Sequence, residues 1–332
     1  MKTFFIFWLA NLLIILNVGL AKKGVENRYH KFSETCMGTE FSMIIDEDDL
    51  AFSKRVAQEA FKEAFMFDNI LSDYISESEL SKLSQNSGYQ GFTAISDDLF
   101  NVLAKAQTLS IATKGSFDIT IGPLTRLWRI ARFKGILPQG DKLSSAQKRV
   151  GYKNILLDHS KQEVKLLKKG MTLDLGGIAK GYAADQMLKI CKFNNLPRVL
   201  IDAGGDILVG EAPRNKKGWL VEIGGRKHPD LPILTLSNIA IATSGDIEQS
   251  VTINKKTYSH LIDPKTGLGL TSLAQITIIA PSAMEADSLA SACLVLGMDE
   301  TKNLLQSKTE VTAYYLNQTN NNIILHQIVG GH

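Results

Sequence analysis

Six short stretches hold the residue types that could do chemistry, and each is a glycine-rich or acidic turn. They span residues 115–120, 174–181, 202–206, 242–246, 260–267 and 287–291. Turns of this kind supply many backbone N–H groups and few permanent positive charges. A site that holds a polyphosphate together with a metal ion needs that combination. Each stretch alone could also be an ordinary tight turn, so the prediction depends on the set.

The stretch 174–181 reads Asp-Leu-Gly-Gly-Ile-Ala-Lys-Gly and leads into an expected helix. Gly176 and Gly177 allow close approach of a ligand to the backbone, and the helix N-terminus favours an anion. Lys180 could add a full positive charge. The alternative is a strand-to-helix turn in which the glycines serve packing and Lys180 is solvated. The glycine spacing does not match the dinucleotide fingerprint G-x-G-x-x-G.

Two stretches carry candidate acid–base and metal-binding side chains. His260 ends an apolar run beside an acidic turn, and a neutral imidazole near pH 7 can act as a general base. Asp287 and Ser291 are four residues apart on an expected helix and therefore share a face. Their oxygens are hard ligands of the kind that Mg²⁺ prefers. Structural roles for all three residues are the alternative, with Ser291 bonding back along its helix.

The other three stretches are weaker candidates for ligand contacts. Asp118 could accept a hydrogen bond from a ribose or a ring N–H, although a helix-ending turn also explains it. The pair Gly204 and Gly205 indicates either a bulge or the close approach of another group. The hydroxyls of Thr243 and Ser244 could hold phosphate oxygens, or they could belong to a polar turn.

Helices and strands must position these turns, and they alternate without a regular βαβ pattern. Apolar spacing predicts helices over 52–67 and 99–109, with others after the turn at 174–192 and over 285–296. Strands are predicted at 39–46, 154–158, 163–167, 199–209, 220–223, 239–243, 257–262, 275–280, directly after Asp118, and twice in the tail. Loops are expected at 76–91 and 133–145. The pattern favours an α+β fold, and the absence of a long linker favours one large domain over residues 35–330.

Composition excludes several classes of protein. The chain has 332 residues, of which 44% are hydrophobic and 21% charged, so it is not intrinsically disordered. Lys and Arg total 37 against 34 for Asp and Glu, a net charge of +3. Because no basic cluster stands out, nucleic-acid binding is not expected. Three cysteines allow at most one disulfide, and Cys191 and Cys293 lie in apolar helical stretches where buried thiols are expected.

The N-terminus has the pattern of an export signal. Lys2 precedes an apolar run over 4–20, and Gly19 and Ala21 form a small-residue cleavage site before Lys22. An uncleaved anchor is the alternative, since the run is almost long enough to span a bilayer. Residues 22–34 are polar and are expected to form an irregular tether. The first cysteine after the apolar run is Cys36, so no lipid-attachment site is present.

The ordered set of motifs resembles the FAD:protein FMN transferase family, the ApbE-type flavin transferases. The matching residues span 37–39, 72–74, 78–80, 115–124, 128, 150–152, 174–185, 202–206, 242–246, 260–267 and 286–297. The resemblance therefore covers roughly residues 35–297. It implies an ApbE-like domain of mixed sheets and packed helices, with the flavin site between them.

The resemblance also implies a function and a set of site residues. The enzyme would depend on Mg²⁺, bind FAD and transfer its FMN moiety to a Ser or Thr hydroxyl of an exported protein, releasing AMP. The acceptor would carry a D-x-x-S/T-G-A-S/T-like motif. His260 would act as the base, and Asp287 would be catalytic and a metal ligand together with Ser291 and the Gly177 carbonyl. The implied FAD contacts are Met37, Tyr74, Ser116, Phe117, Asp118, Asp174, Lys180 and Ile262.

The same resemblance implies a location in the periplasm. Many relatives are lipoproteins, whereas this chain lacks the lipid-attachment cysteine. It would therefore be free after cleavage of residues 1–21 and would meet the membrane only through membrane-bound targets.

Two other functions remain open from the sequence. The first is an FAD pyrophosphatase in which water is the acceptor and FMN and AMP are the products. The second is a flavin-binding protein without turnover, which would need neither the base His260 nor Asp287. Self-flavinylation is not expected, because residues 263–267 fit the first five acceptor positions but Leu268 and Gly269 break the rest.

Overall fold

A computed structural model describes residues 28–223, 231–245, 250–272, 274–319 and 322–331. Its helices are α1 (Leu50–Leu71), α2 (Glu79–Gln85), α3 (Asp97–Ala112), α4 (Gly122–Lys134), α5 (Gly140–Gln147), α6 (Ala179–Phe193), α7 (Ala283–Leu296) and α8 (Met298–Leu305), with a 3₁₀ turn, η1 (Tyr152–Asn154). The predicted export signal at 1–21 lies outside the described residues, as does Asp246.

The strands fall into one large sheet and three small ones. The large sheet contains β1 (Tyr29–Cys36), β2 (Thr39–Asp46), β6 (Val199–Ala203), β7 (Asp206–Val209), β10 (Ile239–Gly245), β13 (Ala274–Ala280), β14 (Thr312–Thr319) and β15 (Asn322–Val329). The small sheets pair β3 (Thr93–Ala94) with β5 (Glu163–Leu166) and β4 (Ile155–Asp158), β8 (Trp219–Glu222) with β9 (Ile233–Leu236), and β11 (Ser250–Ile253) with β12 (Lys256–Ser259). All paired strands in the large sheet are antiparallel.

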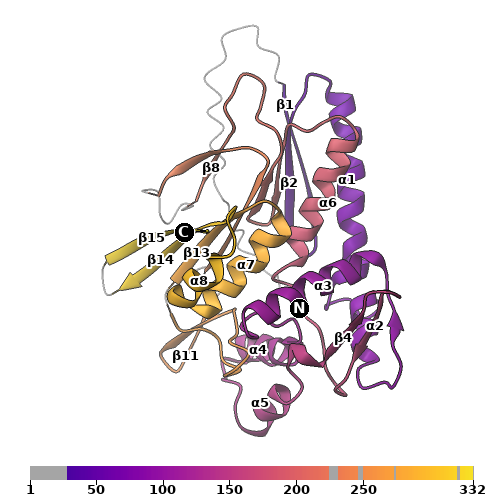
Figure 1. The fold of residues 1–332 in the computed structure, drawn as a ribbon, viewed down its shortest axis with the longest axis vertical. Coiled ribbons are helices and arrows are strands. Elements are labelled where there is room, and N and C mark those ends of the chain that lie inside the picture. Colours follow the sequence, from indigo (N-terminus) through magenta and orange to yellow (C-terminus); the bar gives the residue numbers. More distant parts are fainter. Residues whose placement is uncertain (1–27, 224–230, 246–249, 273, 320–321, 332) are drawn as a thin grey trace, which may run out of the picture.

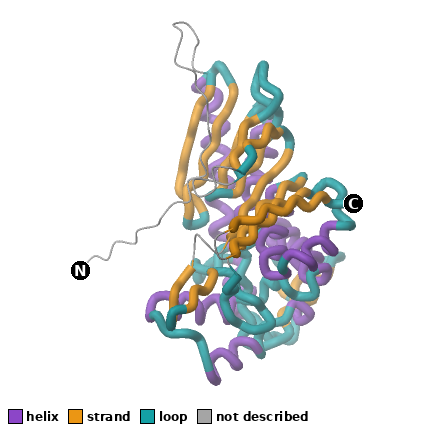
Figure 2. The backbone as a smooth tube through the Cα atoms, turned by 90° about the vertical axis from the view of Figure 1, so that its left-hand side faces the viewer, coloured by secondary structure: helices purple, strands orange, loops and turns teal. Residues whose placement is uncertain are grey.

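The large sheet buries both faces, because side chains alternate between them along each strand. In β2, Met43 faces the helices and is paired with Ile201, whereas Ile44 points to the opposite face and is paired with Leu200. The first face carries α1, α6 and α7, and the second lies under the β8–β9 ribbon around Trp219. Figure 1 shows α1 and α6 side by side along the strands, and Figure 2 shows the strands and helices as separate layers.

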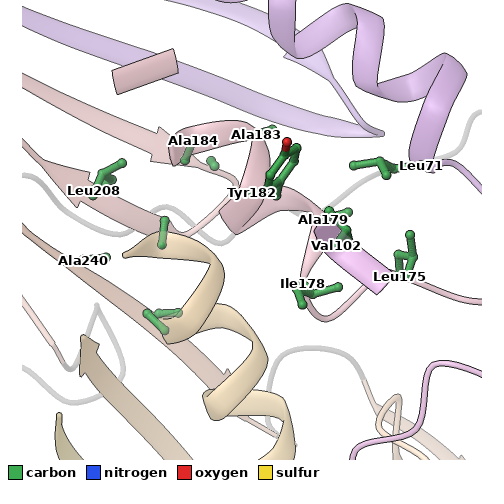
Figure 3. Close-up of a cluster of buried hydrophobic side chains, with 14 of the residues drawn as sticks. Leu71, Val102, Leu175, Ile178, Ala179, Tyr182, Ala183, Ala184, Leu208 and Ala240 are labelled. Atoms are coloured by element: carbon green, nitrogen blue, oxygen red, sulfur yellow. The ribbon is translucent and has the colours of Figure 1, made fainter. Parts of the chain in front are cut away.

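The main core lies between the sheet and the helices. Figure 3 shows α6 contributing Tyr182, Ala183 and Ala184, close to Leu208 and Ala240 from two strands. Small side chains along α6 let the helix lie near its neighbours. Gly181 is the extreme case, because a Cβ there would overlap the Ala283 carbonyl oxygen and lie 2.7 Å from the Met284 Cα. Helices α6 and α7 therefore meet almost backbone to backbone.

A smaller core attaches α4 to the segment that follows β12. Trp128 is fully buried at its centre, and its Nε1 donates to the Gly267 carbonyl over 2.9 Å. The Trp128 and Tyr258 rings lie 5.4 Å apart. Ile262 is buried in the same cluster. This cluster fixes the loop that carries His260.

The α+β architecture agrees with the sequence prediction, and the predicted helices and strands lie within a few residues of the observed ones. Four local predictions were wrong. The polar segment 22–34 contains most of β1, whose mixed polar residues suit an edge strand. The predicted loop 76–91 contains α2, capped by Ser78. The segment after Asp118 forms α4 rather than a strand, and the loop 133–145 contains the start of α5.

Strand β12 ends at Ser259, one residue before His260, so the histidine lies in a loop rather than at a strand end. Among the described residues, no helix combines the length and hydropathy required to cross a bilayer.

Candidate functional site

One cavity of about 400 Å³ collects nearly all of the predicted site residues. Its lining comes from the loop after α1, the turn before α4, α4 itself, the turn before α6, the β6–β7 turn, β10, the loop after β12, and α7. The predicted residues that line it are Tyr74, Ser116, Phe117, Asp118, Asp174, Gly177, Lys180, His260, Ile262, Asp287 and Ser291. Segments distant in sequence therefore converge on a single site.

Met37 is the predicted FAD contact that does not line this cavity. It lies in the β1–β2 turn with a φ of 50°, and its backbone N–H donates to Asp68 Oδ2 over 3.0 Å. The neighbouring Thr39 contacts Gly204, where an added Cβ would lie 2.7 Å from Thr39 Oγ1. Gly204 does line the cavity, so the turn that holds Met37 supports the cavity wall.

Lys180 forms ion pairs with two acidic residues in the cavity. Its Nζ lies 2.8 Å from Asp206 Oδ2 and 3.4 Å from Asp287 Oδ2. Burial opposes the charge on Lys180, but the two carboxylates raise its pKa above the ordinary value. Burial raises the pKa of Asp287 to about 7, while the charge of Lys180 and the Gly181 N–H oppose that rise. Asp206 thus completes a lysine–carboxylate triad.

Gly177, Asp287 and Ser291, the three predicted metal-binding residues, line the same cavity. A Cβ on Gly177 would lie 2.9 Å from Ser291 Oγ, so the glycine backbone directly approaches that hydroxyl. Asp287 and Ser291 are both almost fully buried on α7. A carbonyl, a carboxylate and a hydroxyl are the donors that Mg²⁺ accepts. The part of the chain that the structure describes has no cluster of three or more His, Cys, Asp or Glu residues suited to a metal.

Asp118 holds the shape of the cavity wall. Its Oδ1 accepts from the Thr120 N–H over 2.8 Å and from Thr120 Oγ1 over 2.6 Å. Its Oδ2 accepts from the Tyr152 N–H over 2.8 Å. Burial raises the pKa of Asp118, and these donors act against the rise. The carboxylate thus ties the turn before α4 to η1 while it faces the cavity.

Arg129 on α4 brings together three other cavity residues. Its Nη1 lies 2.7 Å from Asp73 Oδ2, and its Nη2 lies 3.7 Å from Asp174 Oδ2. Its guanidinium carbon lies 3.9 Å from the centre of the Tyr74 ring. Arg132, one turn further along, donates to the His260 carbonyl over 3.4 Å.

Sequence reasoning gave no role to Asp206, Arg129 or Arg132. Asp206 lies in one of the six singled-out stretches, and that stretch could have suggested it. The two arginines lie on a helix that the sequence did not predict, beside Trp128. The residues next to Arg129 and Arg132 in the sequence form no motif that indicates a binding site.

A wider surface groove of about 940 Å³ lies between α3, β4 and α6. It contains none of the predicted site residues and has one carboxylate, Asp185. Both oxygens of Asp185 accept from the first N–H groups of α7, at 2.8 and 2.9 Å. The predicted site residues therefore lie in the smaller cavity and not in this groove.

The antiparallel sheet backed by helices, with one cavity lined by glycine turns and a buried carboxylate, places the chain in a family of flavin transferases when it is compared with known proteins. The sequence model of the ApbE family matches residues 37–315. The chain belongs to the ApbE family, and the resemblance found in the sequence is confirmed.

Curated relatives extend along nearly the whole chain. A protein of Haemophilus influenzae is 29% identical over 94% of this chain and 93% of its own length. A protein of Treponema pallidum is 28% identical over 95% of this chain and 92% of its own. Both are named FAD:protein FMN transferase.

Solved structures have the same fold. The flavin transferase ApbE from Vibrio cholerae, in a mutant form, aligns with a TM-score of 0.82 at 24% identity, covering 90% of this chain and 97% of its own. The ApbE protein of Thermotoga maritima aligns with a TM-score of 0.76 at 25% identity, covering 90% and 94%. These likenesses confirm the predicted α+β fold.

Proposed function

We propose that this protein is a Mg²⁺-dependent FAD:protein FMN transferase. It moves FMN from FAD to a Ser or Thr hydroxyl of an exported protein and releases AMP. The observation that carries the proposal is the convergence of Lys180, Asp287, Ser291 and His260 on one cavity beside a glycine turn. The shared name of the full-length relatives supports the same reaction.

The cavity suits the negative charge of a pyrophosphate. Helix α6 begins at Ala179, and its N-terminal end and the Lys180 ammonium both favour an anion. In the preceding turn the Gly176 N–H donates to Asp174 Oδ1 over 2.9 Å, which fixes the turn, so little reorganisation is needed when charge builds up. Tyr74, at the cavity edge, offers an aromatic face for a flavin ring.

The residues present fit a magnesium ion. The Gly177 carbonyl, the Asp287 carboxylate and the Ser291 hydroxyl would hold it, because they are hard oxygen donors grouped in one place. Lys180 favours the carboxylate form of Asp287. When bound, the ion neutralises negative charge on the pyrophosphate oxygens during displacement.

His260 serves as the general base. It accepts the proton of the acceptor hydroxyl while that oxygen forms a bond to the FMN-side phosphorus. The bond between this phosphorus and the bridging oxygen breaks, and AMP leaves with the electron pair. The Arg132 hydrogen bond to the His260 carbonyl holds the backbone of the base in place.

The direct test combines the purified chain with FAD, Mg²⁺ and a domain that carries a D-x-x-S/T-G-A-S/T-like motif. Mass spectrometry measures an FMN-sized increment on the acceptor, and chromatography measures AMP and free FMN. We expect a Mg²⁺-dependent adduct, reduced by about 100-fold or more in Asp287→Ala and His260→Ala. Matched controls are Asp299→Ala and His159→Ala, which remove the same groups outside the cavity.

The products separate the alternatives. AMP and free FMN without an adduct would replace transfer by hydrolysis, with water as the acceptor. Intact FAD that binds but does not react would replace catalysis by flavin binding.

We also propose that the protein acts in the periplasm after cleavage before Lys22. The support is the apolar run and small-residue site within residues 1–21, followed by no nearby lipid-attachment cysteine. Fractionation of expressing cells and sequencing of the mature N-terminus test this. A chain that retains Met1 in the membrane fraction would contradict it.

A further inference from the structure

Arg129 joins two carboxylates and an aromatic ring at the cavity. Asp73 and Tyr74 come from the loop after α1, Asp174 comes from the turn before α6, and Arg129 comes from α4. The arginine is the group that all three share, through the 2.7 Å and 3.7 Å ion pairs and the 3.9 Å approach to the ring. The arrangement therefore links three segments that are not neighbours in sequence.

The first consequence concerns charge. Asp73 and Asp174 both line the cavity that would receive FAD, whose pyrophosphate carries two negative charges. The two acidic side chains are largely shielded from solvent, with exposed fractions of 20% and 13%. Without a cation between them, they would repel each other and an entering anion. The guanidinium of Arg129 offsets that repulsion.

The second consequence concerns the aromatic ring. Tyr74 is 77% exposed, which leaves most of its side chain without protein neighbours. The guanidinium covers one face of the ring, a contact that stabilises the ring in one orientation. Because the Asp73 and Asp174 carboxylates hold the Arg129 guanidinium in place, the guanidinium in turn holds the Tyr74 ring in one position. Its uncovered face is then available to a planar ligand.

We propose that Arg129 is a positioning residue for the flavin substrate, holding the Tyr74 ring for stacking and cancelling the charge of Asp73 and Asp174. This inference rests on the proposed function and adds to it a residue that determines how FAD is bound. Arg129 acts through these neighbours and takes no part in the displacement at phosphorus.

The test uses Arg129→Gln, Asp73→Asn and the double variant. We expect Arg129→Gln to raise KM for FAD by about tenfold and to change kcat by less than about threefold, because one cation and one stacking contact are lost. Adding Asp73→Asn should lower that KM several-fold, since it removes an uncompensated carboxylate. A purely structural role for Arg129 would give no such rescue.

Riboflavin, which lacks phosphate, separates stacking from charge. Its binding is measured by quenching of flavin fluorescence. We expect Arg129→Gln to weaken riboflavin binding, and Asp73→Asn in that background to leave it weak. Arg129→Lys keeps the charge but loses the planar group, so it should keep FAD binding closer to wild type than riboflavin binding. This variant also serves if Arg129→Gln does not fold.

The measured KM values and the behaviour of the wild-type chain decide the inference. A KM for FAD in Arg129→Gln within twofold of wild type would overturn it. A raised KM without rescue by Asp73→Asn would overturn the charge-balancing role. If the wild-type chain neither binds nor turns over FAD, the proposed function fails, and the inference fails with it. Normal wild-type transfer together with an unaffected Arg129→Gln variant makes the inference alone fail.

Discussion

At the residue scale, burial sets the charge state of acidic groups around the cavity. Asp202 precedes the glycine pair, and its Oδ1 accepts from the Gly205 N–H over 2.7 Å. Burial raises the pKa of Asp202 from 3.8 to about 6, and the charge of Asp206 adds to the rise. The folded chain therefore holds a proton here that the unfolded chain releases between these two values. Folding stability from this group falls as the pH rises through that window.

The first prediction is that Asp202→Asn stabilises the chain at high pH. The amide cannot ionise, so the variant should gain about 2–3 kcal/mol at pH 8 and much less at pH 3.5. Urea unfolding at both values measures the difference. Asp299→Asn is the control, since the Asp299 side chain is 91% exposed. An equal gain at both pH values would contradict the ionisation argument.

The second prediction concerns Gly177, which lies beside Ser291, one of the proposed metal ligands. Gly177→Ala places a methyl group 2.9 Å from Ser291 Oγ and 3.2 Å from Ser291 Cβ. We expect Mg²⁺ affinity, measured by calorimetry with FAD present, to fall by about tenfold or more as the hydroxyl is displaced. Gly176→Ala is the matched control, because its methyl meets the end of the Asp174 side chain at 3.1 Å. Equal losses in both variants would contradict a special role for Gly177.

Sequence predicted His260, Asp287 and Ser291 as site residues because each lies in a short motif that resembles a known family, and all three line one cavity. It could not identify Arg129, whose partners lie 56 residues before it and 45 after it, counting from Asp73 and Asp174. Ion pairs of this kind depend on the fold and leave no local pattern.

At the element scale, the site depends on the crossing of α6 and α7. Lys180 and Asp287 face each other across this crossing, and Gly181 allows the two helices to approach. Asp185 strengthens it by accepting from the Ala283 and Met284 N–H groups at the start of α7. The close contact of α6 and α7 thus places Lys180 of one helix opposite Asp287 of the other.

The third prediction is that Gly181→Ala destabilises the whole chain. The added methyl overlaps backbone atoms of residues 283 and 284, which cannot rotate away as a side chain would. We expect a loss of about 3 kcal/mol or more in free energy of unfolding. Gly135→Ala, at the end of α4, meets no atom within 4 Å and has a φ of 66°, so it should cost about 1 kcal/mol. Urea unfolding compares the two, and similar losses would contradict close helix contact.

Most elements were predictable because their apolar spacing reflects burial on one or two faces. Helix α1 buries Val56, Ala60 and Ala64 at four-residue steps, as the pattern predicted. Helix α4 escaped prediction because its buried face is narrow and its remaining residues are basic or exposed. Pro123 near its first position was the available sign of a helix start.

At the scale of the whole molecule, the small core around Trp128 is separate from the cores on the two faces of the large sheet. It carries the loop with His260 and Ile262 against α4. Loss of its packing should therefore affect the cavity before it affects the sheet.

The fourth prediction is that Trp128→Phe loosens the loop over residues 258–269 more than it loosens the large sheet. The change removes the indole N–H that donates to the Gly267 carbonyl, at a cost of about 1–3 kcal/mol. Hydrogen exchange should rise over residues 258–269, while the sheet stays protected. Trp219→Phe is the matched control, because that indole donates to the Glu211 backbone carbonyl, also over 2.9 Å, on the far face of the sheet. Unchanged exchange over 258–269 would contradict the prediction.

The order of strands across the large sheet follows their order along the chain, from β1 to β15. A chain that emerges from a ribosome or a translocation channel can therefore add each new strand beside one already in place. The cavity forms later than the first strands of the sheet, because its lining includes both Asp73 and Ser291, which are far apart along the chain. A nascent chain would assemble much of its sheet before it could hold a flavin nucleotide. Flavin binding would thus require that α7 has been synthesised and has folded against α6. It would distinguish nearly complete chains from shorter nascent ones.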